Sequence, residues 1–222
     1  MCGRFAFYSP SEAAAALFGM TGSTDIEPRY NIAPTQYVAA IREDDQGQRE
    51  IVMLRWGLVP FWAKDPAIGN RMINARAETV AEKPSYRAAY RHRRCIVLAD
   101  GFYEWQRHGD GKVPHYISLA SGEPFALAGL WEHWNDKNSN TNLQTTTLIT
   151  TEASDFMKPL HHRMPVVLSA DTADEWLAGS TEFLDDVASR MPPLQAWPVD
   201  RRVNNARNEG PELIEAAGDI LR

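Results

Sequence analysis

The chain has 222 residues, of which 44% are hydrophobic, and carries a formal net charge of −6 at pH 7. This length allows one or two domains with a sizeable core, and the acidic total excludes the overall basic charge that is typical of DNA-binding proteins, so any contact with DNA has to depend on a local patch. Two cysteines, Cys2 and Cys95, are too few for a disulfide framework, and no apolar run reaches the roughly 18–20 residues of a membrane span, so we expect a soluble cytoplasmic protein with no membrane partner.

The N-terminal region predicts one helix followed by a loop. Ser9 suits the N-cap, Pro10 the first helical position and Glu12 a capping box, and the helix is expected to end near Gly19. The polar segment 21–36 contains two prolines, which favour a loop without regular structure.

From Tyr37 onward, short runs rich in β-branched and aromatic residues predict strands. They lie at 37–43, 49–60, 94–107, 115–120, 124–134, 145–153 and 165–169, with turn signals at 44–48 and 108–112. Helical patterns follow at 169–179, 180–191 and 209–218. Because no repeat, low-complexity tract or linker divides the chain, we predict a single α+β domain over 1–222, with a mostly antiparallel sheet or barrel and helices at its edges.

Cys2 follows the initiator methionine directly, and its small side chain permits removal of Met1 by a methionine aminopeptidase. The new N-terminus would be a 1,2-aminothiol whose α-amine has an ordinary pKa of about 7.7–8.0. Such a group can condense with an aldehyde and close to a thiazolidine, or it can attack an amide carbonyl as in N-terminal-nucleophile hydrolases. The alternative is that methionine is retained and Cys2 is a small buried residue.

The run GFYEW (101–105) places Glu104 among large aromatic residues. In a strand, Phe102 and Glu104 point one way while Tyr103 and Trp105 point the other way. A carboxyl group in apolar surroundings has a raised pKa and can act as a general acid or base. The alternative is a salt-bridged or exposed glutamate.

Two adjacent histidines, His161 and His162, precede a predicted strand. Neighbouring side chains on an extended segment point in opposite directions, so we expect only one of them to face a site. None of the histidines has the spacing of metal ligands, so we expect no metal.

Three further segments could contact a polar or nucleic-acid ligand. Asn74 and Arg76 are two residues apart, hence on one face if the segment is extended, and suit a ligand that carries phosphate. The aromatic residues that end 56–62, beside a proline, could stack on bases, although a core position is the favoured interpretation. The basic run 87–95 predicts a solvated face, and it is the one run that could offset the acidic total.

Taken together and in this order, seven motifs resemble the SOS response associated peptidase (SRAP) family, also called abasic-site processing proteins. They are MCGRF (1–5), RYNIAP (29–34), WGLVPFW (56–62), INARAET (73–79), ADGFYEW (99–105), HHRMP (161–165) and NNARNEGPEL (204–213). The resemblance extends from residue 2 to about 214.

The resemblance implies a sensor of abasic sites in single-stranded DNA that forms a covalent thiazolidine crosslink through Cys2, and it leaves open whether that crosslink is reversed or is permanent. It implies that Asn74 orients the sugar or the N-terminus, that Glu104 is the acid or base, and that His161, the first residue of the family's His-x-Arg-x-Pro pattern, assists proton transfer. It assigns the phosphates to Arg4, Arg76 and Arg163, a hydrogen bond to Thr151 and base stacking to Trp62. It implies no cofactor, and we expect a monomer whose DNA affinity falls with salt.

Two other functions use overlapping residues. The family's older name implies a cysteine peptidase or amidohydrolase, which would share Cys2, Glu104 and His161 but would need oxyanion donors and a peptide groove. A non-covalent single-stranded DNA binder would not need Cys2 at all. Chemistry favours the aldehyde trap, because a thiol that adds to the imine removes the electron sink required for β-elimination and strand cleavage.

Overall fold

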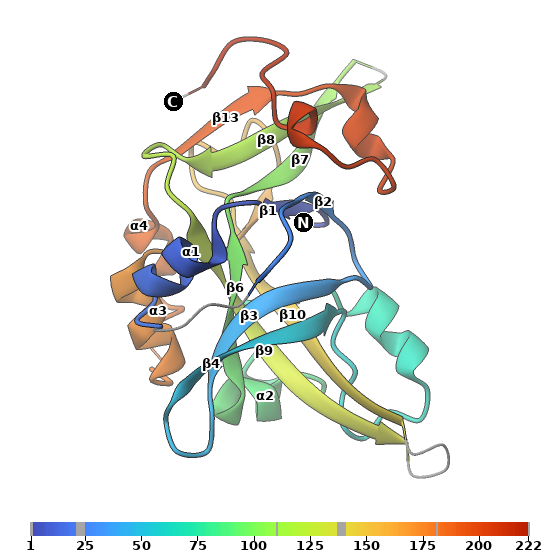
Figure 1. The fold of residues 1–222 in the computed structure, drawn as a ribbon, viewed down its shortest axis with the longest axis vertical. Coiled ribbons are helices and arrows are strands. Elements are labelled where there is room, and N and C mark those ends of the chain that lie inside the picture. The colour runs from blue at the N-terminus through green and yellow to red at the C-terminus, as the bar shows by residue number, and fades with distance from the viewer. Residues whose placement is uncertain (1, 21–24, 110, 137–140, 181, 222) are drawn as a thin grey trace.

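Two sheets account for most of the computed structural model, which describes residues 2–20, 25–109, 111–136, 141–180 and 182–221. One sheet lies above the other in Figure 1. The upper sheet is wholly antiparallel, with the order β13-β8-β7-β1-β2. Its strands are β1 (Phe5–Phe7), β2 (Arg29–Ile32), β7 (Gly101–His108), β8 (Gly111–Leu119) and β13 (Leu194–Pro198).

The lower sheet closes on itself like a barrel, because β10 pairs with both β4 and β9 at the two ends of the order β10-β4-β3-β6-β9. Strands β11, β12 and β5 attach to this ring. Only the pairings of β10 with β4 and β5 are parallel in the described part of the chain, so the predicted mostly antiparallel architecture is confirmed. The bounds are β3 (Tyr37–Glu43), β4 (Arg49–Trp56), β5 (Asn74–Arg76), β6 (Arg94–Ala99), β9 (Phe125–Asp136), β10 (Thr141–Glu152), β11 (Arg163–Pro165) and β12 (Val167–Leu168).

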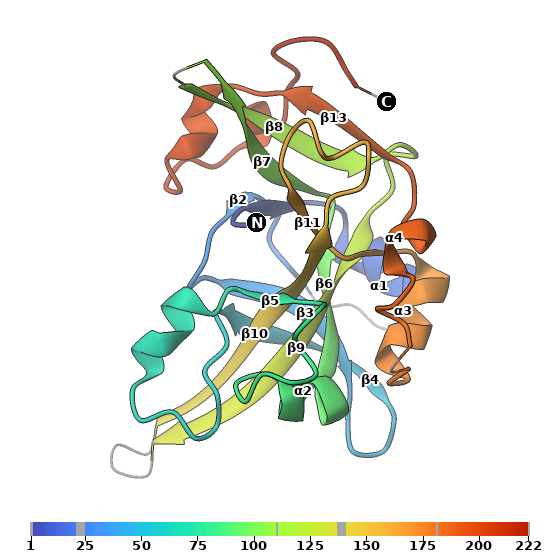
Figure 2. The ribbon, with the colours of Figure 1, turned by 180° about the vertical axis from the view of Figure 1, so that it is seen from behind.

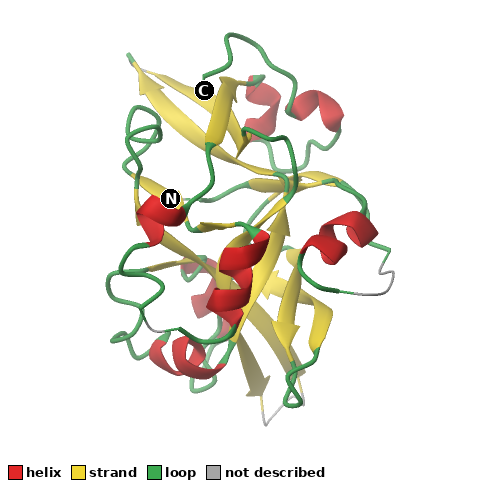
Figure 3. Ribbon diagram, turned by 90° about the vertical axis from the view of Figure 1, so that its left-hand side faces the viewer, coloured by secondary structure: helices red, strands yellow, loops and turns green. Residues whose placement is uncertain are grey.

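Helices are short and surround the strands, as Figure 3 shows. They confirm the predicted peripheral placement, and no helix of the described ranges is long and apolar enough to cross a membrane. The α-helices are α1 (Ser11–Leu17), α2 (Arg87–His92), α3 (Ala170–Leu177) and α4 (Val187–Arg190), and the 3-10 turns are η1 (Pro66–Arg71), η2 (Arg201–Asn204) and η3 (Pro211–Leu213).

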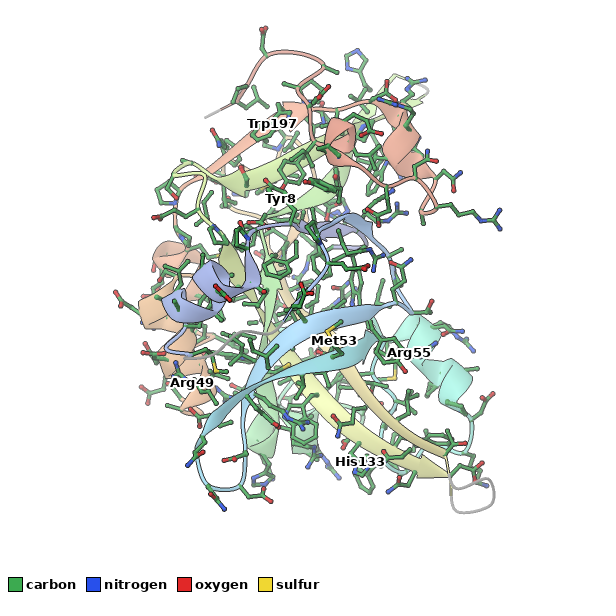
Figure 4. All side chains as sticks on the ribbon, viewed as in Figure 1. Tyr8, Arg49, Met53, Arg55, His133 and Trp197 are labelled. Atoms are coloured by element: carbon green, nitrogen blue, oxygen red, sulfur yellow. The ribbon has the colours of Figure 1, made fainter. Side chains whose placement is uncertain are left out.

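One large hydrophobic cluster joins the two sheets, and a smaller one lies on the other face of the upper sheet. Phe5 of β1 meets Trp56 of β4 edge to face, with ring centroids 5.2 Å apart. Tyr8 and Trp197, labelled in Figure 4, border the smaller cluster, which is built on Tyr103 and Tyr116. The strand that carries the predicted acid therefore has aromatic packing on both faces.

The start of the chain differs from the sequence prediction. Ser9 does not cap α1, whose N-cap is Pro10 without a side-chain hydrogen bond. Instead the buried carboxylate of Asp100 accepts hydrogen bonds from the backbone N–H groups of Tyr8 and Ser9, at 2.6 and 2.8 Å, and from the Ser9 hydroxyl at 2.5 Å. Asp100 also separates β6 from β7, which the sequence predicted as one strand.

Other predicted elements are corrected or confirmed in turn. The segment 21–36, expected to be a loop, contains β2, because its backbone pairs with β1. Within the described residues, the pattern at 180–191 yields α4 alone and that at 209–218 yields η3 alone. The helix at 169–179 is confirmed as α3, with Ser169 as its N-cap.

The basic run is only partly a solvated face. The buried guanidinium of Arg94 stacks over the rings of Tyr90 and Trp176, 4.4 Å from each centroid, and donates to the carbonyls of Trp176 and Ser180. Arg93 pairs with the buried carboxylate of Glu132 at 2.9 Å. These two arginines are structural, which leaves less of the run to act as a basic patch.

Replacing Ser169 with alanine is expected to destabilise the fold by about 1 kcal/mol, because the hydroxyl caps α3 in a reciprocal capping box with Thr172. For a chain of this size the melting temperature should fall by about 2–4 °C in a thermal denaturation experiment. Ser85→Ala is the control, since no hydrogen bond of its hydroxyl occurs within the described residues. Equal effects of the two changes would contradict a capping role.

Candidate active site

Cys2 is buried between the two sheets, just before β1. In Figure 2 the start of the chain lies beside β2, below β7 and β8 and level with β11. The side-chain amide of Asn74 donates to the Cys2 carbonyl at 2.7 Å, and the Cys2 Sγ lies 3.9 Å from the carbonyl oxygen of Arg4. The residue is thus held through its backbone as well as enclosed.

Asn74 reaches Cys2 from β5, which runs parallel to β10 with Asn74 opposite Leu148. The segment is therefore extended, which is the condition under which the spacing of Asn74 and Arg76 places both on one face. The backbone carbonyl of Asn74 accepts a hydrogen bond from the Tyr86 hydroxyl at 3.2 Å. Its side-chain Oδ1 is buried without a hydrogen-bond partner in the described parts of the chain. A buried acceptor of this kind suits an N–H donor brought by a ligand or by a new N-terminus.

Glu104 is only 3% exposed, on β7, and its neighbours alternate as predicted. Tyr103 and Trp105 pack in the smaller cluster, while Phe102 joins the large one. Burial raises the pKa of Glu104, against the opposing charges of His162 and Lys112. The carboxyl group is therefore closer to a neutral-pH acid or base than a solvated glutamate.

The Cys2 thiol and Glu104 influence each other electrostatically. Burial, with a contribution from the negative charge of Glu104, raises the pKa of the Cys2 thiol to about 12. The thiol is consequently protonated at neutral pH, and it needs a base before it can act as a nucleophile. Glu104 is the carboxyl group that acts on it most strongly.

The two histidines do not point in opposite directions, contrary to the sequence prediction. Their rings stack with centroids 4.3 Å apart, because the backbone N–H of His161 still donates to the Met157 carbonyl in a turn and β11 begins only at Arg163. His161 is half-buried, and its Nδ1 lies 3.0 Å from both the backbone nitrogen and the carbonyl oxygen of Arg163. The ring is therefore oriented with Nε2 away from this backbone. Desolvation lowers the pKa of His161, so the ring is neutral near pH 7.

A cavity of about 330 Å³ opens beside these histidines. Its lining combines an aromatic ring, cations and both imidazoles, which suits an anionic ligand with planar groups. The residues are Trp105, Arg107, Lys112, Pro159, Leu160, His161 and His162. Among the described residues, no group of three or more His, Cys, Asp or Glu side chains is placed to hold a metal ion.

Three of the predicted DNA-contacting residues meet on adjacent strands. β10 lies between β5 and β11, with Thr150 opposite Arg76 and Thr151 opposite Met164. Arg163 begins β11 and donates to the Thr150 carbonyl at 2.7 Å. Arg76 is exposed and Thr151 is buried.

The Arg4 side chain forms hydrogen bonds within the protein, away from the strands that carry Arg76 and Arg163. Its Nη1 donates to Asn31 Oδ1 at 2.7 Å and to the Val203 carbonyl at 2.8 Å, and its guanidinium lies 5.8 Å from the Trp105 ring centroid. Asn31 is fully buried, and its amide nitrogen donates to the carbonyls of Asn205 and Asn208 at 3.0 and 2.9 Å. Arg4 therefore ties the N-terminal segment to β2 and to the C-terminal part of the chain.

Trp62 is 49% exposed, beside Phe61 at 59%, whereas Trp56 of the same motif is buried. The favoured core interpretation is therefore wrong for both Phe61 and Trp62. The loop that carries Trp62 is held by a hydrogen bond, since Trp134 Nε1 donates to the Ala63 carbonyl at 2.7 Å. A Cβ at Gly57, where φ is +127°, would lie 2.5 Å from the Gly69 carbonyl oxygen, so the loop closes by direct backbone contact.

Sequence reasoning missed two residues of this region, Asn31 and Glu78, and it set His162 aside in favour of His161 although both line the cavity. Glu78 forms two hydrogen bonds with Arg163 at 2.7 and 3.0 Å. The signal that was available is spacing, since Glu78 follows Arg76 by two residues. Asn31, a polar residue inside RYNIAP, becomes intelligible only when the C-terminal segment is seen to pack on it.

Comparisons with known proteins agree on the family and the fold of the chain. The family model described as SOS response associated peptidase (SRAP) matches residues 1–206. The chain is 42% identical to the abasic site processing protein YoqW of Bacillus subtilis, over 97% of this chain and 100% of that one, and 34% identical to YedK of Escherichia coli, over 97% and 99%. A crystal structure of a protein from Bacteroides thetaiotaomicron superposes with a TM-score of 0.84 at 25% identity, covering 97% of this chain and 100% of that one.

Proposed function

This chain belongs to the SOS response associated peptidase (SRAP) family, and from that premise we propose that it captures abasic sites in single-stranded DNA as a covalent crosslink. Relatives over nearly the full length are named abasic site processing proteins, which supports abasic DNA as the target. The observation that carries the proposal is the grouping of a buried Cys2, a glutamate with a raised pKa and an asparagine that holds the Cys2 carbonyl. The protein would act in the cytoplasm, in association with DNA.

The reaction requires removal of Met1, so that Cys2 carries a free amine. The neutral amine adds to the aldehyde carbon of the ring-opened abasic sugar, and loss of water gives an imine. The thiol sulfur then adds to the imine carbon while the imine nitrogen receives a proton, which closes a five-membered thiazolidine. Every atom of Cys2 and of the sugar is retained except the one water molecule.

Glu104 is the proposed proton carrier for these steps. Its buried carboxyl group can protonate the departing hydroxyl and, once ionised, can receive the thiol proton. Asn74 fixes the backbone of Cys2 through its amide, and its buried Oδ1 offers an acceptor for the Cys2 amine. His161, oriented by the Arg163 backbone, is proposed to assist proton transfer at the sugar oxygen.

The DNA path is proposed to run over β5, β10 and β11. Arg76 and Arg163 supply cations for backbone phosphates, and Thr151 lies on the strand between them. Trp62, exposed on a fixed loop, supplies a face on which a base can stack. Because Arg4 is engaged with Asn31 and Val203, its contribution to phosphate binding would come only from donors other than Nη1.

The test is a denaturing gel with protein whose Met1 removal has been confirmed by intact mass. It is incubated with a single-stranded oligonucleotide that carries one abasic site, and in parallel with the same oligonucleotide after borohydride reduction of the aldehyde. We expect a slow band that survives heat and detergent with the aldehyde form only. No band from the unreduced oligonucleotide would reject covalent capture and direct the work to peptidase assays.

Asn74→Ala is expected to slow crosslinking about tenfold, because it releases the Cys2 carbonyl and removes the buried acceptor without removing the nucleophile. The measurement is the single-turnover rate of crosslink formation at saturating protein, where weaker DNA binding does not contribute. The final yield should approach that of the wild type. An unchanged rate would show that Asn74 does not position Cys2 for the reaction.

A further inference from the structure

The carboxylate of Glu78 is paired with the guanidinium group of Arg163. Its two carboxylate oxygens accept hydrogen bonds from Nη1 at 2.7 Å and from Nη2 at 3.0 Å. Nη2 also donates to the Thr150 carbonyl at 2.7 Å. Both terminal nitrogens of this arginine are therefore already hydrogen-bonded within the protein.

The carboxylate lies on the solvent side of the pair. The Arg163 side chain is 12% exposed and that of Glu78 is 43% exposed. Although partial burial opposes it, the hydrogen bond from Arg163, together with the charges of Arg163 and Arg76, lowers the pKa of Glu78. Glu78 is thus an anion at neutral pH, within electrostatic reach of both arginines.

A carboxylate and a phosphate use the same face of a guanidinium, because each offers two oxygens to its planar fork of N–H donors. A backbone phosphate that approaches Arg163 therefore meets a bound anion that it must displace or repel. Repulsion between charges at this exposed position is modest and is screened by salt.

We propose that Glu78 is an affinity-setting residue: it competes with the backbone phosphates of single-stranded DNA for Arg163 and so weakens binding to intact strands. This inference rests on the proposed function, in which Arg163 contacts phosphate. Discrimination between abasic and intact DNA would then depend on the covalent step at Cys2, because an intact strand has no aldehyde to react and dissociates quickly.

The contacts of Thr150 with Arg163 indicate that Glu78 competes for Arg163 and is not needed to hold the arginine side chain in place. Without Glu78, the Arg163 guanidinium keeps its 2.7 Å hydrogen bond to the Thr150 carbonyl, and Thr150 Oγ1 lies 3.4 Å from the same nitrogen. Removing the carboxylate should therefore free the donors of Arg163 without releasing its side chain.

The test uses the full chain after Met1 removal and a labelled single-stranded oligonucleotide without an abasic site, so that no crosslink contributes. Fluorescence anisotropy should give a Kd for Glu78→Gln that is about three- to tenfold lower than for the wild type at low salt, with a smaller difference at high salt. Glu82→Gln is the matched control: it removes the same charge from the same segment, and within the described residues its carboxylate forms no ion pair with Arg163. It should change the Kd by less than twofold.

If Glu78→Gln binds the oligonucleotide more weakly than the wild type, Glu78 holds Arg163 in position and the competition proposal is wrong. Unchanged binding by Glu78→Gln, with a clear loss in Arg163→Gln, would also overturn the inference while leaving the phosphate role of Arg163 intact. If Arg163→Gln binds as tightly as the wild type, the phosphate role itself fails and the inference fails with it. Crosslinking to the abasic oligonucleotide, measured separately, reports on the proposed function independently of all three.

Discussion

Cys2→Ser is expected to abolish the heat-stable crosslink, with a loss of at least a hundredfold in yield. After Met1 removal, serine still offers an α-amine and can form an imine, but its hydroxyl is a far poorer nucleophile toward the imine carbon than a thiol. The imine is hydrolysed during denaturation, so no band should persist on the gel. Serine is nearly isosteric with cysteine and should fit the buried position between the sheets.

Cys95→Ser is the matched control for this change. Cys95 is also fully buried, and burial raises the pKa of its thiol to about 12 as well. Its Sγ lies 3.5 Å from Thr146 Oγ1, a contact that a serine hydroxyl can keep. We expect full crosslinking from Cys95→Ser, so equal losses from both variants would mean that general destabilisation, and not loss of the nucleophile, removes the band.

Glu104→Gln is expected to slow crosslinking about a hundredfold or more, because general acid–base catalysis contributes roughly 10²–10⁴ in rate. Glutamine preserves the size and the hydrogen-bonding capacity of the side chain but cannot carry the proton between the thiol, the amine and the sugar. Single-turnover rates with the abasic oligonucleotide measure the effect. Glu123→Gln, in an exposed turn, should react like the wild type.

The pH dependence gives a second readout for Glu104. Because burial raises its pKa, the protonated form persists to higher pH than in a solvated glutamate, and the step that needs an acid should slow as the pH rises through the raised pKa. Glu104→Gln should lack this limb of the profile. Retention of the limb in the variant would assign the titration to another group.

The raised pKa of Glu104 also determines how the stability of the fold changes with pH and in Glu104→Gln. The native state binds the Glu104 proton more tightly than the unfolded state does, so the contribution of this group to stability falls as the pH rises from the ordinary carboxyl pKa through the raised one. Glu104→Gln should therefore be at least as stable as the wild type, increasingly so toward alkaline pH. Its loss of activity would then not reflect unfolding.

Sequence periodicity predicted the features of the site that depend on local structure. The alternation of GFYEW placed Glu104 correctly, since a strand presents every second residue on one face. For the same reason, the spacing of Asn74 and Arg76 placed both on one face if the segment was extended, as β5 is. The stacking of His161 on His162 was not predicted, because a turn that starts at Met157 determines it.

Contacts between distant segments required the structure. Arg4 bonds to Asn31 and to Val203, which are 27 and 199 positions away, so no local pattern reveals that its Nη1 is engaged. The Glu78–Arg163 pair spans 85 positions. For Cys2, only the resemblance to a family indicated its partners, because a lone cysteine has no periodic signal.

The placement of β1 also bears on the order of events during synthesis. Phe5 pairs with Phe102 and Ala6 with Gly101, so the strand behind Cys2 cannot find this partner until roughly a hundred more residues have been made, which takes about 5–20 s at about 5–20 residues per second. For that interval the N-terminus has no β7 to cover it. A ribosome-associated aminopeptidase would thus have a window in which to excise the first residue, which the proposed capture reaction requires. Maturation timed in this way would complete the processing that the proposed reaction needs before β7 pairs with β1 beside Cys2.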